Sequence, residues 1–258
     1  MKKLLVIPDF KNIDDSIRLA RGYDAGFEYN DFNFAKYLDD EAFCEKTVNE
    51  YKSYKLPDYT TNHGAFIDVL PYSTDKKIKE ISIHRINQSI KITRKIGAKS
   101  VVFHLNYNPY LNHELYVKIF PKLNIDVWRP IIEENPDINI YIENMFEQDP
   151  YIIKKVAKAL SEYDNFGLCL DWGHAVLSKT NPQIWAEELK EYVKHIHLND
   201  NDLKVDTHLA WGSGQINRNQ FYNCYNRYLS DATILIETVD IPDQRASLRQ
   251  LEEDGFIK

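Results

Sequence analysis

Short apolar runs recur along the chain, and a polar side chain follows each of them closely. In FGLCLDWGHA, residues 166–175, the apolar run ends at Asp171, and His174 follows three residues later. The same pattern returns in KLLVIPD, GFEYN, YTTNHG, SVVFHLN, INIYIEN, VKHIHLND and ATILIET. β-Branched and aromatic residues dominate these runs, which have the length of strands. We therefore predict eight strands, each ending near one of the polar residues Asp9, Glu28 with Asn30, His63, His104, Glu143, Asp171, His197 and Glu237.

Segments with a helical spacing of apolar residues lie between these runs. The isoleucines of residues 75–96 form a broad apolar surface, and Gly97 is placed to end that helix. In DPYIIKKVAKAL we predict Asp149 as the helix cap and Pro150 at the first helical position. Residues 181–192, NPQIWAEELKEY, repeat the Asn–Pro start and predict a further helix.

This alternation of strands and helices over 258 residues is typical of a (β/α)₈ TIM barrel. The strand-like runs are apolar on both faces, as expected between a barrel core and a ring of helices. An open, doubly wound sheet is the alternative, but its glycine-rich first turn is missing from IPDFKN. Because no linker or low-complexity tract interrupts the chain, we predict one domain over residues 1–258. The carboxyl ends of its strands, and the polar residues there, should meet on one face.

Three carboxylates and a histidine should converge on that face. Glu143, Asp171 and Glu237 would repel one another strongly unless a proton or a cation neutralised them. A divalent cation resolves this conflict, and His197 completes a mostly oxygen-donating ligand set. We therefore predict one divalent metal, Mn²⁺, Zn²⁺, Mg²⁺ or Co²⁺, at Glu143, Asp171, His197 and Glu237.

Additional ligand-type residues are expected close by. In DTHLAWGSGQI, Asp206 and His208 alternate, and the two glycines that follow permit a tight loop. Together with His63, His104 and His174, these residues would suffice for up to three metals. Polar contact to a substrate is their competing role. The other polar residues are expected to be structural or superficial: Asp9, Asn30, His84, His113 and His195.

Composition and charge narrow the partners and the cellular compartment expected for the protein. A net charge of −7 disfavours a general nucleic-acid or anionic-membrane surface. The three cysteines are far apart and form no C-x-x-C motif, which argues against a disulfide scaffold and fits a reducing compartment. The N-terminal apolar run is interrupted at Pro8 and Asp9, too early for a signal peptide. No stretch reaches the roughly 20 apolar residues of a membrane span, so we expect a cytoplasmic protein without membrane partners.

Taken together, the motifs resemble those of the xylose-isomerase-like TIM-barrel superfamily, which contains sugar isomerases and epimerases and endonuclease-IV type nucleases. The resemblance extends from Glu28 to Glu237 through NHGAFIDVLP, GAKSVVFH, YIEN, LDWGHA, HIHLNDND, DTHLAWGSGQI and ILIET. It implies that Glu143 and Glu237 act as catalytic base and acid on a metal-bound sugar. Three aromatic residues are expected either to stack on that sugar or to pack in the core: Phe66, Trp172 and Trp211.

The nuclease branch of this superfamily implies a different function, cleavage of abasic-site DNA at a trinuclear zinc site. All nine of its ligand types have counterparts here: His63, His104, Glu143, Asp171, His174, His197, Asp206, His208 and Glu237. Other segments depart from the nuclease pattern, because ENMFEQDP lacks its glycines, LDWGHA has Trp172, and HLNYNP replaces H-P-G. No cluster of basic and aromatic residues marks a DNA groove. We therefore predict a metal-dependent isomerase or epimerase for a small sugar, sugar phosphate or polyol, with the nuclease as the alternative.

Overall fold

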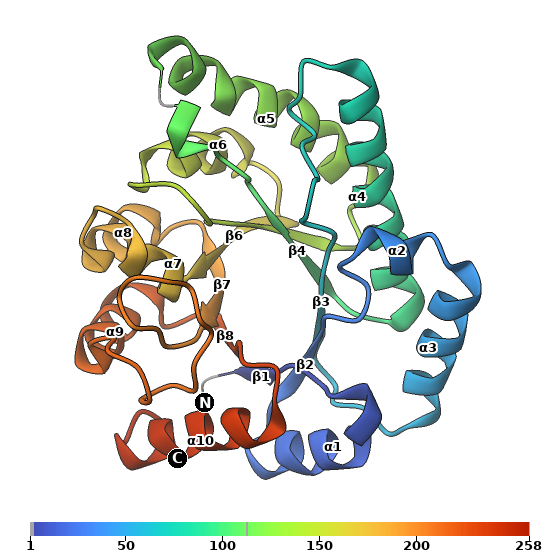
Figure 1. The fold of residues 1–258 in the computed structure, drawn as a ribbon, viewed down its shortest axis with the longest axis vertical. Helices are drawn as coiled ribbons and strands as arrows, with labels where there is room; N and C mark the ends of the chain where they lie inside the picture. Colours follow the sequence, from blue (N-terminus) through green and yellow to red (C-terminus); the bar gives the residue numbers. More distant parts are fainter. Residues whose placement is uncertain (1–2, 112, 258) are drawn as a thin grey trace.

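Eight parallel strands close into a barrel in the computed structural model, which describes residues 3–111 and 113–257 (Figure 1). Each strand pairs with the next one along the chain, and β1 pairs with β8 to close the ring, with Leu4 opposite Ile234. The predicted (β/α)₈ fold is confirmed. The strands are β1 Leu4–Val6, β2 Gly26–Tyr29, β3 Thr60–His63, β4 Ser100–His104, β5 Asn139–Glu143, β6 Phe166–Asp171, β7 Val193–Leu198 and β8 Thr233–Ile236.

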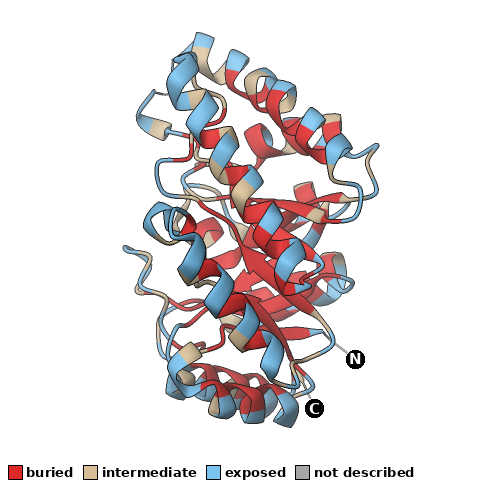
Figure 2. Cartoon of the chain, turned by 90° about the vertical axis from the view of Figure 1, so that its right-hand side faces the viewer, coloured by how far each residue is buried: buried red, intermediate tan, exposed pale blue. Residues whose placement is uncertain are grey.

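Helices surround the barrel, with their inner faces buried and their outer faces exposed (Figure 2). None of the helices in the described part of the chain is both long and apolar enough to cross a membrane. The α-helices are α1 Ile13–Gly22, α2 Ala35–Leu38, α3 Glu41–Ser53, α4 Lys76–Ile96, α5 Glu114–Glu134, α6 Tyr151–Leu160, α7 Trp172–Leu177, α8 Pro182–Leu189, α9 Arg218–Cys224 and α10 Ile241–Glu253. Shorter turns are η1 Phe10–Asn12 and η2 Pro109–Leu111, both 3₁₀, and the π-helical η3 Tyr225–Leu229.

The boundaries of α4 follow from its capping residues. Asp75 accepts hydrogen bonds from the backbone N–H groups of Lys77 and Ile78, which have no partner inside the helix. At the other end, Gly97 has φ of 88°, a left-handed conformation that favours glycine. The end predicted from the sequence is therefore confirmed.

Three boundaries differ from the predictions. Pro150 is the cap of α6 rather than its first residue, because the Asp149 carboxylate accepts from the N–H of Tyr151 and delays the helix by one position. Helix α8 ends at Leu189 and not at the predicted residue 192, because the chain turns toward β7 after Leu189. Strand β1 ends before Asp9, which caps η1 by accepting from the Lys11 N–H.

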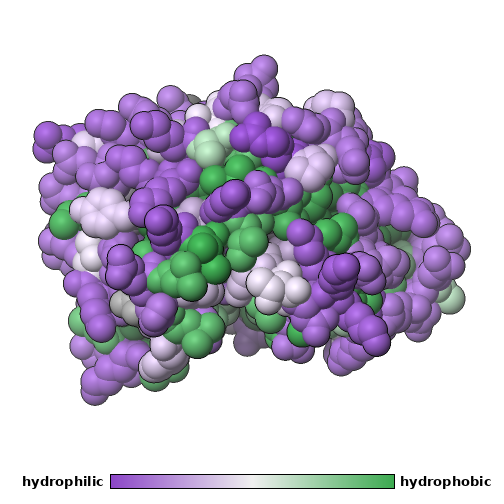
Figure 3. All heavy atoms as spheres, turned by 90° about the horizontal axis from the view of Figure 1, so that it is seen from above, coloured by the Kyte–Doolittle hydropathy of each residue, from purple (hydrophilic) through white to green (hydrophobic). Residues whose placement is uncertain are grey.

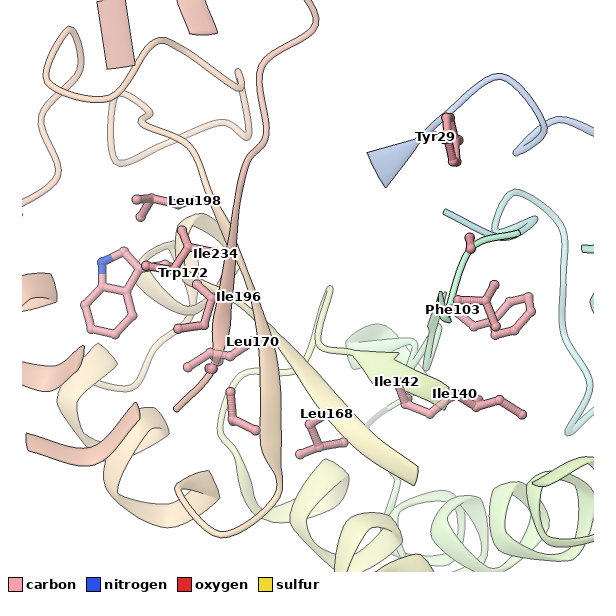
Figure 4. Close-up of a cluster of buried hydrophobic side chains, with 14 of the residues drawn as sticks. Tyr29, Phe103, Ile140, Ile142, Leu168, Leu170, Trp172, Ile196, Leu198 and Ile234 are labelled. Carbon is pink, nitrogen blue, oxygen red and sulfur yellow. The ribbon is translucent and has the colours of Figure 1, made fainter. Parts of the chain in front are cut away.

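The core is divided by the alternation of side chains along each strand. Ile140 and Ile142 of β5 belong to the large cluster between the strands and the helices, part of which is shown in Figure 4. Val102, Tyr141 and Cys169 form a separate small cluster of buried residues. Their strands therefore present one set of side chains to the helical layer and the alternate set to the barrel interior.

Candidate metal centre

The proposed metal ligands continue the inward-facing set of side chains at the strand ends. Glu143 lies two residues beyond Tyr141, and Asp171 lies two residues beyond Cys169, so the alternation directs both carboxylates inward. The register places His104 opposite Glu143 and Asp171 opposite His197. Parallel pairing thus brings together residues that are far apart in the sequence.

Four of these residues form a compact, buried cluster, the four-ligand group: Glu143, Asp171, His197 and Glu237. Their ligand atoms all lie within 4.8 Å of one another. Nδ1 of His197 is 3.4 Å from Oε2 of Glu143 and 3.2 Å from Oε1 of Glu237. Within the described structure, neither carboxylate oxygen of Glu143 has a hydrogen-bond partner. Because buried charged oxygens need compensation, three carboxylates around one imidazole fit a divalent cation well.

Electrostatic coupling within the group shifts its pKa values strongly. Burial would raise the pKa of Glu143, but the nearby positive charges of His104 and His197 hold it well below its usual range. Glu237 is likewise buried, and His197 and His208 lower its pKa to about 2. Burial and the charge of Glu237 raise the pKa of Asp171 well above its usual range, against the opposing effect of His174. The raised pKa of Asp171 thus reflects the carboxylate repulsion that a bound cation would offset.

Asp171 ends a buried strand because it also begins a helix. Its carboxylate accepts a hydrogen bond from the backbone N–H of His174 and caps α7. The N-terminus of a helix favours a negative charge. The Asn144 side chain donates to the Asp171 carbonyl at 3.0 Å and accepts from its N–H at 2.8 Å. This carboxylate is therefore held in position by the local fold.

Glu28 is a buried carboxylate that contacts His197 and positions it. The sequence analysis assigned no role to this residue. Its Oε1 lies 3.0 Å from Nε2 of His197, and its Oε2 accepts from the Thr61 hydroxyl at 2.5 Å. His195 lies 3.1 Å from the same carboxylate and 2.6 Å from the Thr233 hydroxyl, which agrees with the structural role predicted for it. The sequence did contain a signal for this role, because Glu28 is a carboxylate inside the predicted strand GFEY. All four residues of that strand are buried in the structure.

Asn199 is a second positioning residue absent from the prediction. Its side-chain amide donates to Oδ2 of Asp171 at 3.2 Å and to Oε2 of Glu237 at 3.1 Å. The signal was its place two residues after His197, on the same side of the chain. Such partners orient metal ligands and tune their basicity.

Two further groups of ligand-type residues lie beside the four-ligand group, as predicted. In the first, Nε2 of His104 is 3.2 Å and Nε2 of His63 is 3.7 Å from Oε2 of Glu143. In the second, one Asp206 oxygen lies 3.1 Å from His174 and 2.9 Å from His208. Burial lowers the pKa of His208, but Glu237 and Asp206 outweigh it and raise that pKa to about 10.

A large cavity of about 930 Å³ adjoins these groups. The loops after β3, β4, β5, β6 and β7 line it. Phe66 is among its lining residues, and its ring centroid lies 4.7 Å from that of His104, so stacking on a substrate stays a prediction for this residue. His174 and Asp206 also line the cavity, so it leads directly to the ligand-type residues.

Of the two roles left open for the tryptophans, stacking on a sugar or packing in the core, the structure shows packing for both. Trp172 is fully buried among core residues that include Leu198 and Ile234 (Figure 4), with its ring against Phe221. Trp211 is also buried, and its indole N–H donates to the Tyr222 hydroxyl. Asp171 and His174 face inward across the first turn of α7, which directs Trp172 to the outer layer instead. The packing alternative therefore holds for both indoles, and neither is placed to stack on a substrate.

Glu147 is a cavity residue that the sequence analysis did not single out. It is 2% exposed, and Oε2 accepts from the Met145 N–H at 2.7 Å, whereas Oε1 has no hydrogen-bond partner in the described structure. Burial raises the pKa of Glu147 to about 7. Because this oxygen is buried without a partner, the neutral carboxyl is favoured over the carboxylate, which agrees with the raised pKa. Its position in the ENMFEQDP loop gave no periodic signal.

Residues 19–251 match the family described as the xylose isomerase-like TIM barrel. The chain belongs to this family. Two uncharacterized proteins of Methanocaldococcus jannaschii are similar to it in sequence. One is 26% identical over 197 residues, which cover 75% of this chain and 76% of the relative. The other is 28% identical over 202 residues, which cover 74% of this chain and 68% of the relative.

Solved structures share this fold at low sequence identity. A D-tagatose 3-epimerase-like protein has a TM-score of 0.76 and 23% identity, covering 98% of this chain and 96% of its own. A Thermus thermophilus protein soaked with zinc chloride also has a TM-score of 0.76, with 21% identity and coverage of 98% and 97%. Endonuclease IV of the same organism has a TM-score of 0.65, with 15% identity and 98% coverage of both chains. Structures related to both branches considered from the sequence thus share this fold, and these likenesses establish the fold alone.

Proposed function

We propose that the protein is a divalent-metal-dependent isomerase or epimerase that transfers a proton next to the carbonyl of a sugar or polyol. The observation that carries this proposal is the four-ligand group, in which Glu143 and Glu237 approach the same His197 nitrogen at 3.4 and 3.2 Å. Two carboxylates with lowered pKa values are thereby available as proton acceptors at one site. The resemblance to an epimerase-like structure supports the same reaction class.

The donor set defines which residues would hold the metal and which would act on the substrate. Glu143, Asp171, His197 and Glu237 would bind the cation, whose chemistry is to polarise a carbonyl and acidify the adjacent C–H bond. Glu143 or Glu237 would accept the proton from that bond. Transfer by one carboxylate between neighbouring carbons isomerises the substrate, whereas transfer by both on opposite faces inverts a stereocentre. Asn199 would keep Glu237 oriented, because its amide bonds both Glu237 and Asp171.

A second candidate function is phosphodiester cleavage of abasic-site DNA with three zinc ions. The specific observation in its favour is that Glu143 is shared between two ligand-type groups, while His174, Asp206 and His208 form a third. Metal ions arranged in this way stabilise both the attacking and the leaving oxygen. Against it, the cavity beside the site is largely apolar, and Lys204 is the single lysine or arginine among its described lining residues. A phosphate backbone is bound mainly through such cations.

The test is hydrogen exchange between substrate and solvent. Protein loaded with Mn²⁺ is incubated in deuterated water with a panel of ketoses and aldoses, and deuterium incorporation at carbon is followed by NMR. We expect incorporation with the wild type, its loss with E237Q, and its retention with E187Q. Glutamine keeps the volume of Glu237 but accepts no proton, and Glu187 lies on the exposed face of α8.

A parallel incubation with an abasic DNA duplex separates the two functions. The proposal predicts no incision. Efficient incision that is lost in H63A or H104A, together with about three zinc ions per chain, would replace the isomerase with the nuclease.

A further inference from the structure

The large cavity is separated from the metal centre by single side chains. His174 lines the cavity, and its Nδ1 lies 3.5 Å from a carboxylate oxygen of Glu143 and 3.5 Å from one of Asp171. Phe66 lines it as well, with its ring beside that of His104, whose Nε2 is 3.2 Å from Glu143. A ligand that occupies the cavity therefore has its inner end next to the four-ligand group.

One wall of this cavity is a packed set of aromatic rings, the aromatic wall: Tyr72, Tyr107 and Tyr116, backed by Phe120. The rings of Tyr107 and Tyr116 stack with their centroids 5.3 Å apart, and the ring of Phe120 lies 4.6 to 5.3 Å from those of all three tyrosines. Phe120 is fully buried in α5, which fixes the wall to the scaffold. A rigid wall of rings binds apolar groups at little cost in conformational entropy.

Polar side chains that line the cavity are largely hydrogen-bonded within the protein. The Asn106 amide donates to two carbonyls of the loop after β3 at 3.1 and 2.9 Å, and the Tyr72 hydroxyl donates to the Asn106 carbonyl at 2.6 Å. The Tyr116 hydroxyl accepts from the Asn108 N–H at 3.2 Å, and the Ser178 hydroxyl donates to a carbonyl of α7 at 2.8 Å. Ligand hydroxyl groups placed along this surface would lose their hydrogen bonds to water without replacing them, which is unfavourable.

Exposed apolar side chains continue the same surface to the rim of the cavity. Phe146 is 50% exposed and Ile67 48%, and both line the cavity. Seen from the side on which α5 lies, hydrophobic residues gather in the middle of the surface with hydrophilic residues around them (Figure 3). Because large exposed apolar groups around a cavity are typical of a binding site, the rim extends the apolar part of this one.

The two regions fit the two ends of one ligand. The proposed proton transfer uses a carbonyl and one neighbouring carbon that carries a hydroxyl group, and further hydroxyl groups take no part in it. The cavity of about 930 Å³ is left for the rest of the ligand. We infer that the substrate is an α-hydroxy ketone with an apolar tail, alkyl or aryl, whose ketone and hydroxyl group reach the metal centre while the tail lies against the aromatic wall. This inference rests on the proposed function, because it takes the reaction to be proton transfer next to a carbonyl.

Atoms and electrons balance in this transfer. Glu143 or Glu237 takes a proton from the hydroxyl-bearing carbon of a 1-hydroxy-2-ketone, and the electron pair of that C–H bond remains in an enediolate. Return of the proton to the former carbonyl carbon gives the 2-hydroxy aldehyde, while the hydroxyl proton passes to the former ketone oxygen. No oxidant or reductant is consumed, and the tail keeps all its bonds.

The test measures affinity along homologous series by isothermal titration calorimetry on Mn²⁺-loaded protein. Hydroxyacetone, 1-hydroxybutan-2-one, 1-hydroxyhexan-2-one and 1-hydroxyoctan-2-one lengthen an alkyl tail, and 1-hydroxy-4-phenylbutan-2-one carries an aryl tail. Dihydroxyacetone, erythrulose, xylulose and fructose lengthen a hydroxylated tail instead. We expect the dissociation constant to fall about three- to fourfold for each methylene that reaches the wall, and to show no such fall along the ketoses. Tighter binding of the phenyl compound than of the octanone identifies the tail as a ring, and the reverse order as a chain.

The same metal reports the orientation of the ligand. Unpaired electrons of Mn²⁺ broaden the NMR signals of nearby ligand protons, and the effect falls steeply with distance. In 1-hydroxyoctan-2-one we expect the strongest broadening at the protons of the hydroxyl-bearing carbon and the weakest at the terminal methyl group, with Mg²⁺-loaded protein as the control. Equal or reversed broadening would contradict the orientation inferred here.

Variants of the exposed rim locate the binding of the tail. F146S replaces an apolar rim residue by a polar one and should weaken binding of 1-hydroxyoctan-2-one severalfold, while the affinity for hydroxyacetone stays unchanged. F146L keeps the rim apolar and should retain most of the affinity. I184S changes an exposed apolar residue of α8 outside the cavity and should have no effect. Circular dichroism confirms that each variant is folded.

Several results would overturn the inference. Equal affinity along the alkyl series contradicts it, as does tighter binding of a ketose than of every alkyl or aryl compound. A change of oligomeric state in F146S with unchanged affinity for 1-hydroxyoctan-2-one would assign the rim to a second copy of the chain. Binding is measured apart from turnover, so the two proposals fail separately. Tail-dependent binding without deuterium exchange refutes the proposed function and leaves the ligand class standing, whereas exchange on ketoses without tail-dependent binding refutes this inference alone.

Discussion

The four-ligand group and the cavity beside it are built by different parts of the chain. Glu143, Asp171 and His197 lie on strand ends, where the barrel register and the alternation of side chains fix their positions. The cavity is lined mainly by the loops that follow the strands and by η2, whose positions the strand register does not fix, with further residues from α5 and α7. The first region is charged and buried, and the second is largely apolar and partly exposed. The comparison indicates that the barrel determines the chemistry, whereas the loops determine what is bound.

Replacing a strand-end carboxylate should test the chemical region most severely. E143Q keeps the side-chain volume but removes a proton acceptor and weakens a metal ligand. We expect deuterium exchange at the substrate carbon to fall by about 10²- to 10⁴-fold, the usual range for a general acid or base. Measured beside E187Q as an exposed control, near-wild-type exchange in E143Q would refute the catalytic assignment.

Among the cavity residues, Glu147 has a pKa near neutral pH, so its titration should give a measurable pH dependence of stability. Its pKa of about 7 in the folded protein lies above the ordinary value, so the folded state holds the proton more tightly than the unfolded state. The associated stability is fully present below about pH 4.5 and is lost as the pH rises to about 7. In E147Q this loss should be absent, a difference on the order of 3 kcal/mol in the free energy of unfolding.

Urea unfolding of metal-free protein between these pH values measures this difference. E187Q serves as the control for removing one carboxylate from the surface. Parallel pH profiles for the wild type and E147Q would show that the buried carboxyl does not titrate as described.

Glu28 connects the barrel interior to the metal ligands, so its replacement should affect metal binding more than folding. E28Q removes the negative charge beside Nε2 of His197 and should weaken metal affinity about 10- to 100-fold, as for other partners of ligating histidines. T61V removes only a hydrogen bond to Glu28 and should cause a smaller loss. Competition with a chelating dye measures both, and an unchanged metal dissociation constant in E28Q would exclude the positioning role.

Trp172 should give the smallest effect, because it belongs to neither region. Its indole packs on Phe221 in the helical layer, and its N–H has no hydrogen-bond partner in the described structure. W172F should cost about 1–2 kcal/mol of stability from lost packing and leave sugar binding unchanged. A loss of sugar affinity without loss of stability would return this residue to the binding site.

The same division explains how much could be predicted from the sequence. Strand ends such as Asp171 and His197 were predictable because parallel strands of a barrel share one face and their side chains alternate. Glu28 and Asn199 obey the same alternation and were within reach of it. For Trp172 the choice between stacking and packing stayed open, because only the turn of α7 shows that this side chain is carried away from the mouth. Glu147 depends on the conformation of the loop after β5, for which the sequence has no period.

The central claim is that a divalent cation binds between Glu143, Asp171, His197 and Glu237. A crystal grown with Mn²⁺, or soaked with Zn²⁺, tests it directly through anomalous diffraction. The account predicts an anomalous peak at about 2.0–2.2 Å from Nδ1 of His197 and from carboxylate oxygens of the other three residues. No peak at this position in metal-saturated protein, with these four side chains directed to different places, would contradict the account.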